Sequence, residues 1–132
     1  MDSYYMPIIG FTPNPNALIL QLTETSVVAK RISLPRASPY FKILEESKPF
    51  DFGWEENILV ICDPSNSNNE FELLFPSMLP HATKGKFFIL FSIVRKQNDV
   101  LLAGSLTLND YATAHKFLRI RRREKYLPII WE

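Results

Sequence analysis

The sequence is poor in the residues on which catalysis, metal binding and cross-linking most often depend. It contains one cysteine, two histidines and four glycines, and no two glycines are adjacent. A lone cysteine excludes a disulfide within the chain and a cysteine-based zinc cluster. The isolated glycines form no loop of the kind that holds a nucleotide phosphate, and no serine-hydrolase or zinc-protease motif is present. We therefore expect a protein that is not an enzyme and that holds no metal and no small-molecule cofactor.

Long apolar runs are also missing. The longest nearly apolar stretch, residues 87–94, is interrupted by Ser92, and it is far shorter than the roughly 20 residues that cross a bilayer. The first residues, MDSYYMPII, have neither the basic start nor the long apolar core of a secretion signal. The sequence therefore predicts an intracellular protein, cytoplasmic or nuclear.

In contrast, hydrophobic and aromatic residues are abundant. They make up 46% and 13% of the 132 residues, which is enough apolar surface to offset the entropy lost when the chain becomes ordered. No linker and no internal repeat divides the chain, and its length is that of one ordinary domain. We expect residues 1–132 to form a single domain.

Most of the ten prolines lie between the apolar segments, where a residue without a backbone N–H does not interrupt a sheet. The segments between them predict seven strands. These cover residues 4–9, 17–23, 26–33, 57–62, 70–75, 86–95 and 100–106. The stretches 58–61 and 87–94 are the most apolar, which is typical of central strands that are covered on both faces.

Three connections have the composition of turns. Residues 97–99, Gln-Asn-Asp, predict a tight hairpin because Asn and Asp tolerate left-handed backbone angles. Residues 23–25 predict a second hairpin. Residues 64–69 are small and polar, and they predict an exposed loop.

Two segments predict helices. Ser38 followed by Pro39 is a common helix start and introduces a short helix of about two turns. Asn109 suits the N-cap of a second helix, with Asp110 in the first turn, where the helix dipole favours a carboxylate. This helix is expected to pack on the sheet through one apolar face, which consists of Tyr111, Ala114, Phe117 and Leu118.

These elements predict a β-dominated α+β fold, with about seven strands in a sandwich or a partly open barrel and one C-terminal helix. Seven strands followed by a closing helix resemble, in their order, the pleckstrin-homology-like barrels. An OB-like barrel or a mixed α+β sandwich fits the same number of strands. Element order implies an architecture and not a function.

The residues with catalytic chemistry are scattered along the chain. His81 lies in a loop and His115 on the predicted C-terminal helix, and we expect both to be exposed structural histidines. Cys62 ends an apolar strand, so we expect it to be a small buried hydrophobic side chain and not a nucleophile.

One carboxylate cluster, Asp63 with Glu70 and Glu72, is the strongest candidate for an enzyme centre. Asp63 follows a predicted central strand, a place where α/β enzymes often keep an acidic residue. The spacing matches no EF-hand loop, however, and an aspartate before Pro64 also starts an ordinary turn. We therefore expect no divalent-metal site here, and an enzyme centred on this cluster would require metal-dependent activity.

Positive charge is concentrated near the C-terminus. Residues 116–125 have a net charge of +5, which leaves −4 for the rest of a chain whose total is +1. The predicted binding residues are the six cations of this stretch, Lys116, Arg119, Arg121, Arg122, Arg123 and Lys125. Closely spaced arginines suit phosphate, because a planar guanidinium contacts two oxygens at once. The partner would be a nucleic acid, an acidic protein surface, an anionic membrane or a nuclear-import receptor; otherwise the cations only keep the surface soluble.

The backbone of this basic stretch has two solutions. If the helix continues, it presents Lys116, Arg119 and Arg123 to solvent. It must then end near Ile120 or leave the domain. If the chain instead turns into a strand, Leu118 and Ile120 alternate with the cations. Both solutions expose positive charge.

Residues 126–132 are apolar apart from Glu132. Such a segment either returns to its own sheet or adds to the groove or sheet edge of a partner. A proline within it favours an edge strand or an extended peptide. The residues predicted to dock a partner are Ile129, Ile130 and Trp131.

The sequence therefore predicts a non-enzymatic interaction module, a small subunit or accessory factor of a larger protein assembly. Its partner would be another protein or further copies of the same chain. The alternative is a nucleic-acid-binding protein that uses the basic stretch 116–125. The two functions differ in their response to salt, since phosphate binding weakens steeply with salt and apolar docking does not.

Overall fold

The computed structural model describes residues 8–40, 51–55, 57–62, 71–75, 83–85 and 87–132 of the chain. Twelve strands and the ten-residue helix α2 (Leu108–Phe117) lie in these residues. The strands are β1 (Ile8–Phe11), β2 (Asn16–Leu22), β3 (Val27–Ser33), β4 (Asp51–Glu55), β5 (Ile58–Cys62), β6 (Phe71–Leu74), β7 (Thr83–Gly85), β8 (Phe88–Gln97), β9 (Val100–Gly104), β10 (Arg119–Arg122), β11 (Lys125–Tyr126) and β12 (Ile129–Trp131).

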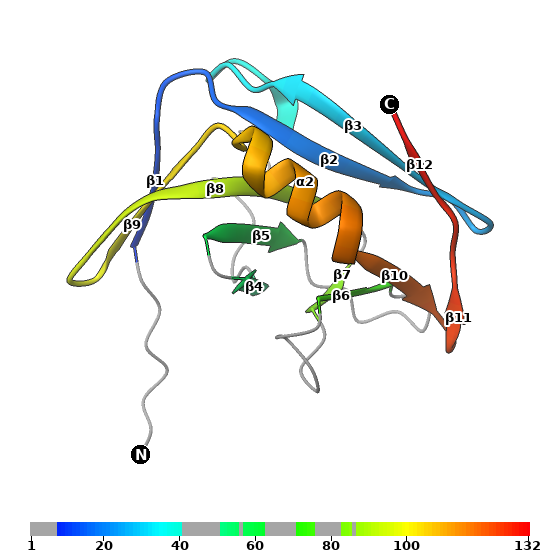
Figure 1. The fold of residues 1–132 in the computed structure, drawn as a ribbon. Coiled ribbons are helices and arrows are strands. Elements are labelled where there is room, and N and C mark those ends of the chain that lie inside the picture. Colours follow the sequence, from blue (N-terminus) through cyan, green and yellow to red (C-terminus); the bar gives the residue numbers. More distant parts are fainter. Residues whose placement is uncertain (1–7, 41–50, 56, 63–70, 76–82, 86) are drawn as a thin grey trace.

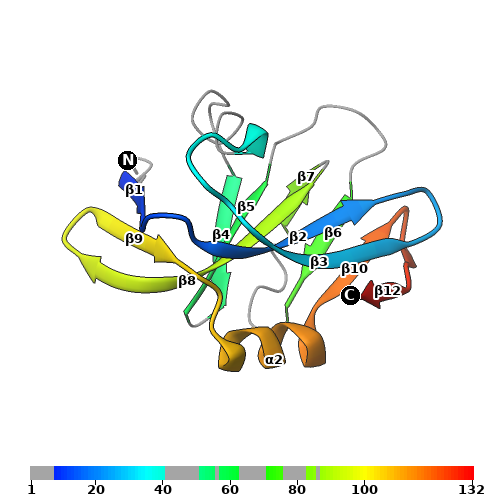
Figure 2. The same cartoon turned by 90° about the horizontal axis from the view of Figure 1, so that it is seen from above.

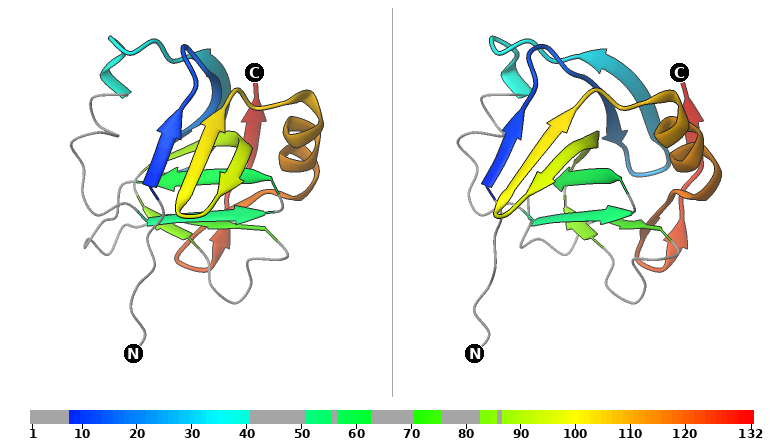
Figure 3. Two further views of the ribbon diagram at one scale, coloured as in Figure 1. Left: turned by 90° about the vertical axis from the view of Figure 1, so that its left-hand side faces the viewer. Right: turned by 60° about the vertical axis from the view of Figure 1, so that its left-hand side comes forward.

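The strands form two sheets (Figure 1). The larger has eight strands in the order β1-β9-β8-β2-β3-β12, with β5 attached to β8 and β4 to β5, and the smaller has the order β11-β10-β6-β7. Figure 2 and Figure 3 show α2 at one side of the molecule, beside both sheets. The predicted β-dominated α+β class is confirmed, and the two sheets do not close into a barrel.

Strand β8 connects the parts of the larger sheet. Leu90 pairs both with a residue of β2 and with a residue of β5, so these two strands lie on opposite edges of β8. Ser92 pairs both with a residue of β5 and with a residue of β9. It follows that β9 takes over the edge that β2 occupies nearer the start of β8. Over residues 88–92 the backbone of β8 therefore has strand partners on one or both sides.

Both faces of β8 are buried as well. Phe88 and Leu90 belong to a core that includes buried residues of β6, β10 and α2. Ile89 and Phe91 belong to a second core with buried residues of β2, β5 and β9. Because successive side chains of a strand point to opposite faces, one unbroken apolar run supplies both cores. This confirms the central position predicted for residues 58–61 and, within the run 87–94, for residues 88–92; Val94, at its end, is 57% exposed.

Each of the seven predicted strands has a counterpart in the structure. The segment predicted at 4–9 overlaps β1 only in residues 8–9, and residues 4–7 lie outside the described part of the chain. Strands β7 and β11 are three and two residues long, too short for a periodic pattern to predict them. Strand β4, with five residues, was also not predicted.

The turn chemistry predicted both hairpins correctly. Asn98 and Asp99 join β8 to β9, and Asn98 has a left-handed φ of 52°. In the turn between β2 and β3, the N–H of Ser26 donates to Oγ1 of Thr23 at 3.0 Å. The loop predicted at 64–69 lies outside the described residues. So does the predicted first helix beyond residue 40.

Helix α2 begins two residues earlier than the sequence predicts. Its N-cap is Thr107 and not Asn109, since Oγ1 of Thr107 accepts a hydrogen bond from the N–H of Asp110 at 3.1 Å. The reason lies in the sheet: Oγ of Ser92 accepts from the N–H of Thr107 at 2.9 Å and donates to the carboxylate of Asp110. Ser92 is 3% exposed and is the one buried polar side chain among the described residues, so it fixes where the helix starts.

The face by which α2 packs on the sheets is largely the predicted one. Ala114 and Leu118 are buried, and Tyr111 is half-buried against the same core. Phe117 contradicts the prediction, because it is 42% exposed. The helix ends at Phe117 and Leu118 already has extended backbone angles, so the inward turn of the chain leaves Phe117 on the outside.

Replacement of Leu118 by alanine is expected to lower the free energy of unfolding by roughly 2–5 kcal/mol, as for other buried leucines. The matched control is Leu108→Ala, which makes the same deletion on the same helix at a side chain that is 75% exposed. That change should stay below about 0.5 kcal/mol. Denaturant titration measures both variants, and equal effects would contradict the packing of Leu118.

Replacement of Ser92 by alanine is expected to cost about 1–3 kcal/mol, because it leaves the Thr107 N–H and the Asp110 carboxylate without their partner. Thr113→Ala is the control: it also removes a hydroxyl from this region, but Thr113 bonds only to the Asn109 carbonyl within the helix and its loss should change little. Thermal unfolding compares the two. A Ser92 variant as stable as the control would show that the link between β8 and α2 does not stabilise the fold.

Candidate interaction surface

The basic stretch that the sequence singles out forms a β-hairpin and not a continued helix. Strand β10 begins directly after α2, pairs antiparallel with β6, and turns into β11. Leu118 and Ile120 are both buried in the core, which is the period of two that the strand solution requires. The prediction of a helix through this stretch is therefore wrong, and the alternative strand is confirmed.

Arg121 is held by the fold. Its Nε and Nη2 donate to the two carboxylate oxygens of Glu72 at 3.1 and 3.2 Å, across the pairing of β10 with β6. The hydrogen bond to Glu72 raises the pKa of Arg121 above its ordinary value. A two-point contact of this kind has a fixed geometry, so Arg121 and Glu72 pin the two strands together. Neither presents its charge to a partner.

Two more arginines of the stretch contact the chain itself. The guanidinium of Arg122 lies over the ring of Phe71, with 5.5 Å between Cζ and the ring centroid. Nη1 of Arg119 donates to the carbonyls of Leu118 at 2.9 Å and Lys116 at 3.4 Å, where α2 ends. A cation at this position satisfies carbonyls that the last helical turn leaves without partners. Arg119 stays exposed, whereas Arg122 is half-buried.

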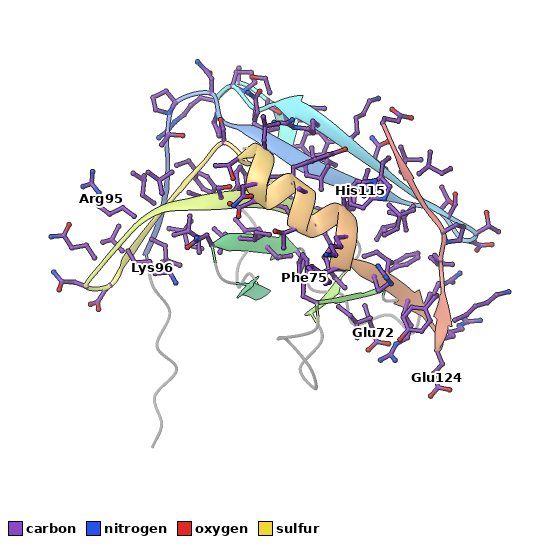
Figure 4. The ribbon with its side chains drawn as sticks, in the orientation of Figure 1. Glu72, Phe75, Arg95, Lys96, His115 and Glu124 are labelled. Carbon is purple, nitrogen blue, oxygen red and sulfur yellow. The ribbon has the colours of Figure 1, made fainter. Side chains whose placement is uncertain are left out.

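Lys116, Arg123 and Lys125 are exposed, and the ammonium group of Lys116 lies 5.2 Å from the centre of the Phe117 ring. Arg123 and Glu124 form the two-residue turn between β10 and β11, and both have left-handed φ angles, 51° and 65°. Such turns favour Asn and Gly because a left-handed angle strains other side chains. The sequence holds no usual turn signal here, so the hairpin escaped prediction. Figure 4 shows Glu124 at the tip of this hairpin and Glu72 behind it.

The C-terminal segment returns to its own sheet. Strand β12 pairs in parallel with β3, from Ile129 opposite Val27 to Trp131 opposite Ala29. Ile129 and Trp131 are half-buried against the core, so most of their apolar side-chain surface is covered within the chain. Ile130 points to the other face and is 52% exposed. Of the three residues predicted to dock a partner, Ile130 is therefore the one whose side chain is mostly exposed.

Trp131 also anchors β12 to α2. Its ring lies 4.6 Å from the ring of His115 and 5.8 Å from that of Tyr111, measured between centroids. The guanidinium of Arg31, from β3, lies 5.2 Å from the centre of the Tyr111 ring. Offset and edge-to-face contacts of this kind add to the energy of burial. His115, although exposed, therefore has a packing role.

The other candidate residues are not brought together in the described residues. Cys62 is fully buried in β5, as predicted. Asp63, Glu70 and His81 lie outside the described part of the chain, and Glu72 is engaged with Arg121. Within that part, no group of three or more His, Cys, Asp or Glu side chains is placed to hold a metal ion.

The exposed residues that remain form what we call the C-terminal surface, at the end of the molecule where α2, β10, β11 and β12 meet (Figure 1). Its members are the exposed residues Lys116, Phe117, Arg123, Lys125, Tyr126 and Ile130, of which Ile130 points to the face of the larger sheet opposite α2. Phe117 and Tyr126 were not among the predicted binding residues. The signal for Tyr126 is its place at the start of the apolar segment 126–132.

A hollow lies at the opposite end of the molecule, at the tip of the β8–β9 hairpin. Its volume is about 310 Å³, and it is lined by Arg95, Gln97, Asn98, Val100 and Leu102. Arg95 is its one titratable side chain, so the hollow offers little chemistry. Comparison with protein-family models, with curated proteins and with solved structures gave no match to this chain.

Replacement of Glu124 by glycine is expected to stabilise the protein by about 0.5–1 kcal/mol, because glycine relieves the left-handed strain and gives back part of that gain through its greater freedom when unfolded. Asp99→Gly is the matched control, since Asp99 also occupies the second position of a two-residue hairpin turn but has no left-handed φ. It should give no gain. The denaturant midpoint of unfolding is measured for both variants. A Glu124→Gly variant that is less stable than the unchanged chain would contradict the turn geometry.

Proposed function

We propose that this chain is a non-enzymatic interaction module, a small subunit or accessory factor of a larger assembly, which binds an acidic protein partner through its C-terminal surface. The observation that carries the proposal is the concentration of exposed cations and exposed apolar side chains within residues 116–130, at one end of the molecule. Six large apolar side chains are exposed in the described residues, and three of them, Phe117, Tyr126 and Ile130, lie on this surface. A partner that covers them removes apolar area from water.

The contacts that the six cations make within the chain support a protein partner. Arg119, Arg121 and Arg122 contact carbonyls, a carboxylate and an aromatic ring of their own chain. Four of the six cations are exposed, and two of these four, Lys116 and Lys125, are lysines. A lysine is a point charge and lacks the planar fork that binds phosphate at two points. Fewer guanidinium groups therefore face outward than the sequence suggests.

Nucleic-acid binding is the second candidate, and the observation that favours it is the net charge of +5 on residues 116–125. Phosphate contacts of Lys and Arg give sequence-independent affinity that falls steeply with salt. The carboxylate of Glu72 neutralises part of this charge locally, which makes the stretch a weaker phosphate site than its composition implies.

The described residues contain no helix long and apolar enough to cross a membrane. An intracellular location, cytoplasmic or nuclear, is part of the proposal. Its support is the likeness of the basic stretch to a nuclear-import signal.

Replacement of Lys116, Arg123 and Lys125 by glutamine should remove partner binding and leave folding intact, because exposed charges change stability by less than about 0.5 kcal/mol. The matched control replaces three other exposed cations, Arg36, Arg95 and Lys96, the last two of which lie at the far side of the molecule (Figure 4). Proteins that co-purify with the tagged full chain after nuclease treatment are identified, purified and titrated against both variants. We expect at least a tenfold loss of affinity for the first variant and none for the control.

The same two triple variants distinguish nucleic-acid binding from binding of a protein partner. If the chain binds oligonucleotides of unrelated sequence, the loss of three phosphate contacts should lower the slope of log affinity against log salt by about 2–3. Capture that disappears on nuclease treatment would replace the protein partner by a nucleic acid. If the unchanged chain and both triple variants bind the purified partner with equal affinity, the C-terminal surface is not the binding site.

A further inference from the structure

Strand β12 is an open edge of the larger sheet. In the described part of the chain, β3 is the strand that pairs with it, and nothing pairs with its other side. Figure 1 shows β12 at the outer margin of the molecule, directly after β11. Strand β11 is likewise the last strand of the smaller sheet. One stretch of chain thus forms an edge of both sheets.

The hydrogen bonds of β12 show which backbone groups face outward. The N–H of Val27 donates to the carbonyl of Pro128, and the N–H of Glu132 donates to the carbonyl of Ala29, both at 2.9 Å. Backbone groups of alternate residues point to opposite edges of a strand. Those of Ile129 and Trp131 therefore point away from β3, and they supply two donors and two acceptors to an added strand.

Pro128 does not block this edge. Its carbonyl faces β3, and so does the position where its N–H would be, because both groups of one residue lie on the same edge. The N–H that proline lacks would have pointed toward β3, so its absence does not affect the outer edge. Sheet edges are usually protected by a proline or a charge that faces outward. Here the outward backbone belongs to two apolar residues.

We propose that an extended acidic segment of the protein partner adds to β12 as a further strand of the larger sheet. The inference rests on the proposed function and specifies how the partner is bound. Charge complementarity identifies the occupant: Lys116, Arg123 and Lys125 are exposed ahead of β12 against one exposed carboxylate, Glu124, and Glu132 after β12 lies 3.9 Å from Lys30. Main-chain hydrogen bonds would supply affinity in this mode, and side chains would supply specificity.

The side chains of β12 define the sequence that such a segment needs. Ile129 and Trp131 point into the core, whereas Ile130 is exposed on the other face. A neighbouring strand places a side chain beside Ile130, and β-branched residues gain most from such cross-strand contact. Acidic residues of the added segment would lie nearer Lys125 and complement its charge. The segment is therefore one in which valine or isoleucine alternates with glutamate or aspartate.

A second copy of this chain fits the edge less well. It would meet Arg123 and Lys125 with a stretch that is itself basic, since residues 116–125 carry +5. Like charges across an interface oppose association. Sedimentation of the chain alone tests this, and a dimer that protects the amides of Ile129 and Trp131 from hydrogen exchange would overturn the acidic-segment proposal.

The direct test uses a synthetic octapeptide of alternating valine and glutamate with blocked ends, titrated calorimetrically into the full chain. Two further peptides carry N-methyl groups on the valines only or on the glutamates only. The charge is identical in all three, and both methylated peptides lose amide protons. Since an added strand uses one of its edges, one methylated peptide should bind at least tenfold more weakly than the other. The amides of Ile129 and Trp131 should become protected on binding.

Two variants complete the test. Arg123→Gln with Lys125→Gln should weaken binding of the unmodified peptide about tenfold, or roughly 1.4 kcal/mol, and the control Arg95→Gln with Lys96→Gln should not. Equal binding of the two methylated peptides, or amides of Ile129 and Trp131 that stay unprotected, would overturn strand addition. So would failure of the unmodified peptide to bind. None of these results touches the proposed function, which fails separately if the purified partner binds the Lys116, Arg123 and Lys125 variant as well as the unchanged chain.

Discussion

The central constraint on this fold is the burial of β8 on both faces while its two edges are paired. Phe88 and Leu90 enter one core, Ile89 and Phe91 the other, and β2, β5 and β9 share its edges. No position along residues 88–91 can accept a polar side chain without leaving it unsatisfied in one core. The two cores are thereby held in a fixed relation, and the β2–β3 hairpin, β5 and β9 are all positioned by one strand.

Ser92, the next residue, carries that order to the C-terminal half of the chain. It lies where β8 is still paired on both sides, and its hydroxyl joins the N-cap residue Thr107 to Asp110. Because the start of α2 is fixed on β8, the length of the helix determines where β10 can begin. Leu118 and Ile120 then reach the core between the sheets, and the basic hairpin and β12 follow at the same end of the molecule. A buried polar group is costly unless it is hydrogen-bonded. Here the hydrogen bonds of Ser92 fix the start of α2 and so determine where the residues of the C-terminal surface lie.

The sequence predicts this fold well where periodicity is strong and poorly where tertiary contacts decide. The apolar runs 58–61 and 87–94 could be recognised as central strands because two buried faces leave no alternation. The N-cap was misplaced because Asn109 and Thr107 are both good caps and a serine on a distant strand selects between them. The basic hairpin was missed because its turn, Arg123 and Glu124, lacks the residues that left-handed angles favour. For the candidate site, composition located the charge but could not show that Glu72 holds Arg121 or that β12 returns to β3.

These contacts change what the charge of the basic stretch can do. A count of cations treats all six alike, yet Arg121 holds β10 to β6, Arg122 covers Phe71 and Arg119 closes α2. Their side chains are ordered before any partner arrives, so they add little new contact on binding. The strained turn keeps Arg123 at the tip of the hairpin, and Lys125 follows in β11, the strand that precedes β12 in the chain. The outward backbone groups of β12 belong to apolar residues. Charge then guides an acidic chain to this end of the molecule, while hydrogen bonds to Ile129 and Trp131 require that chain to be extended. An acidic helix would satisfy the first condition and fail the second, because its backbone groups are already bonded to one another.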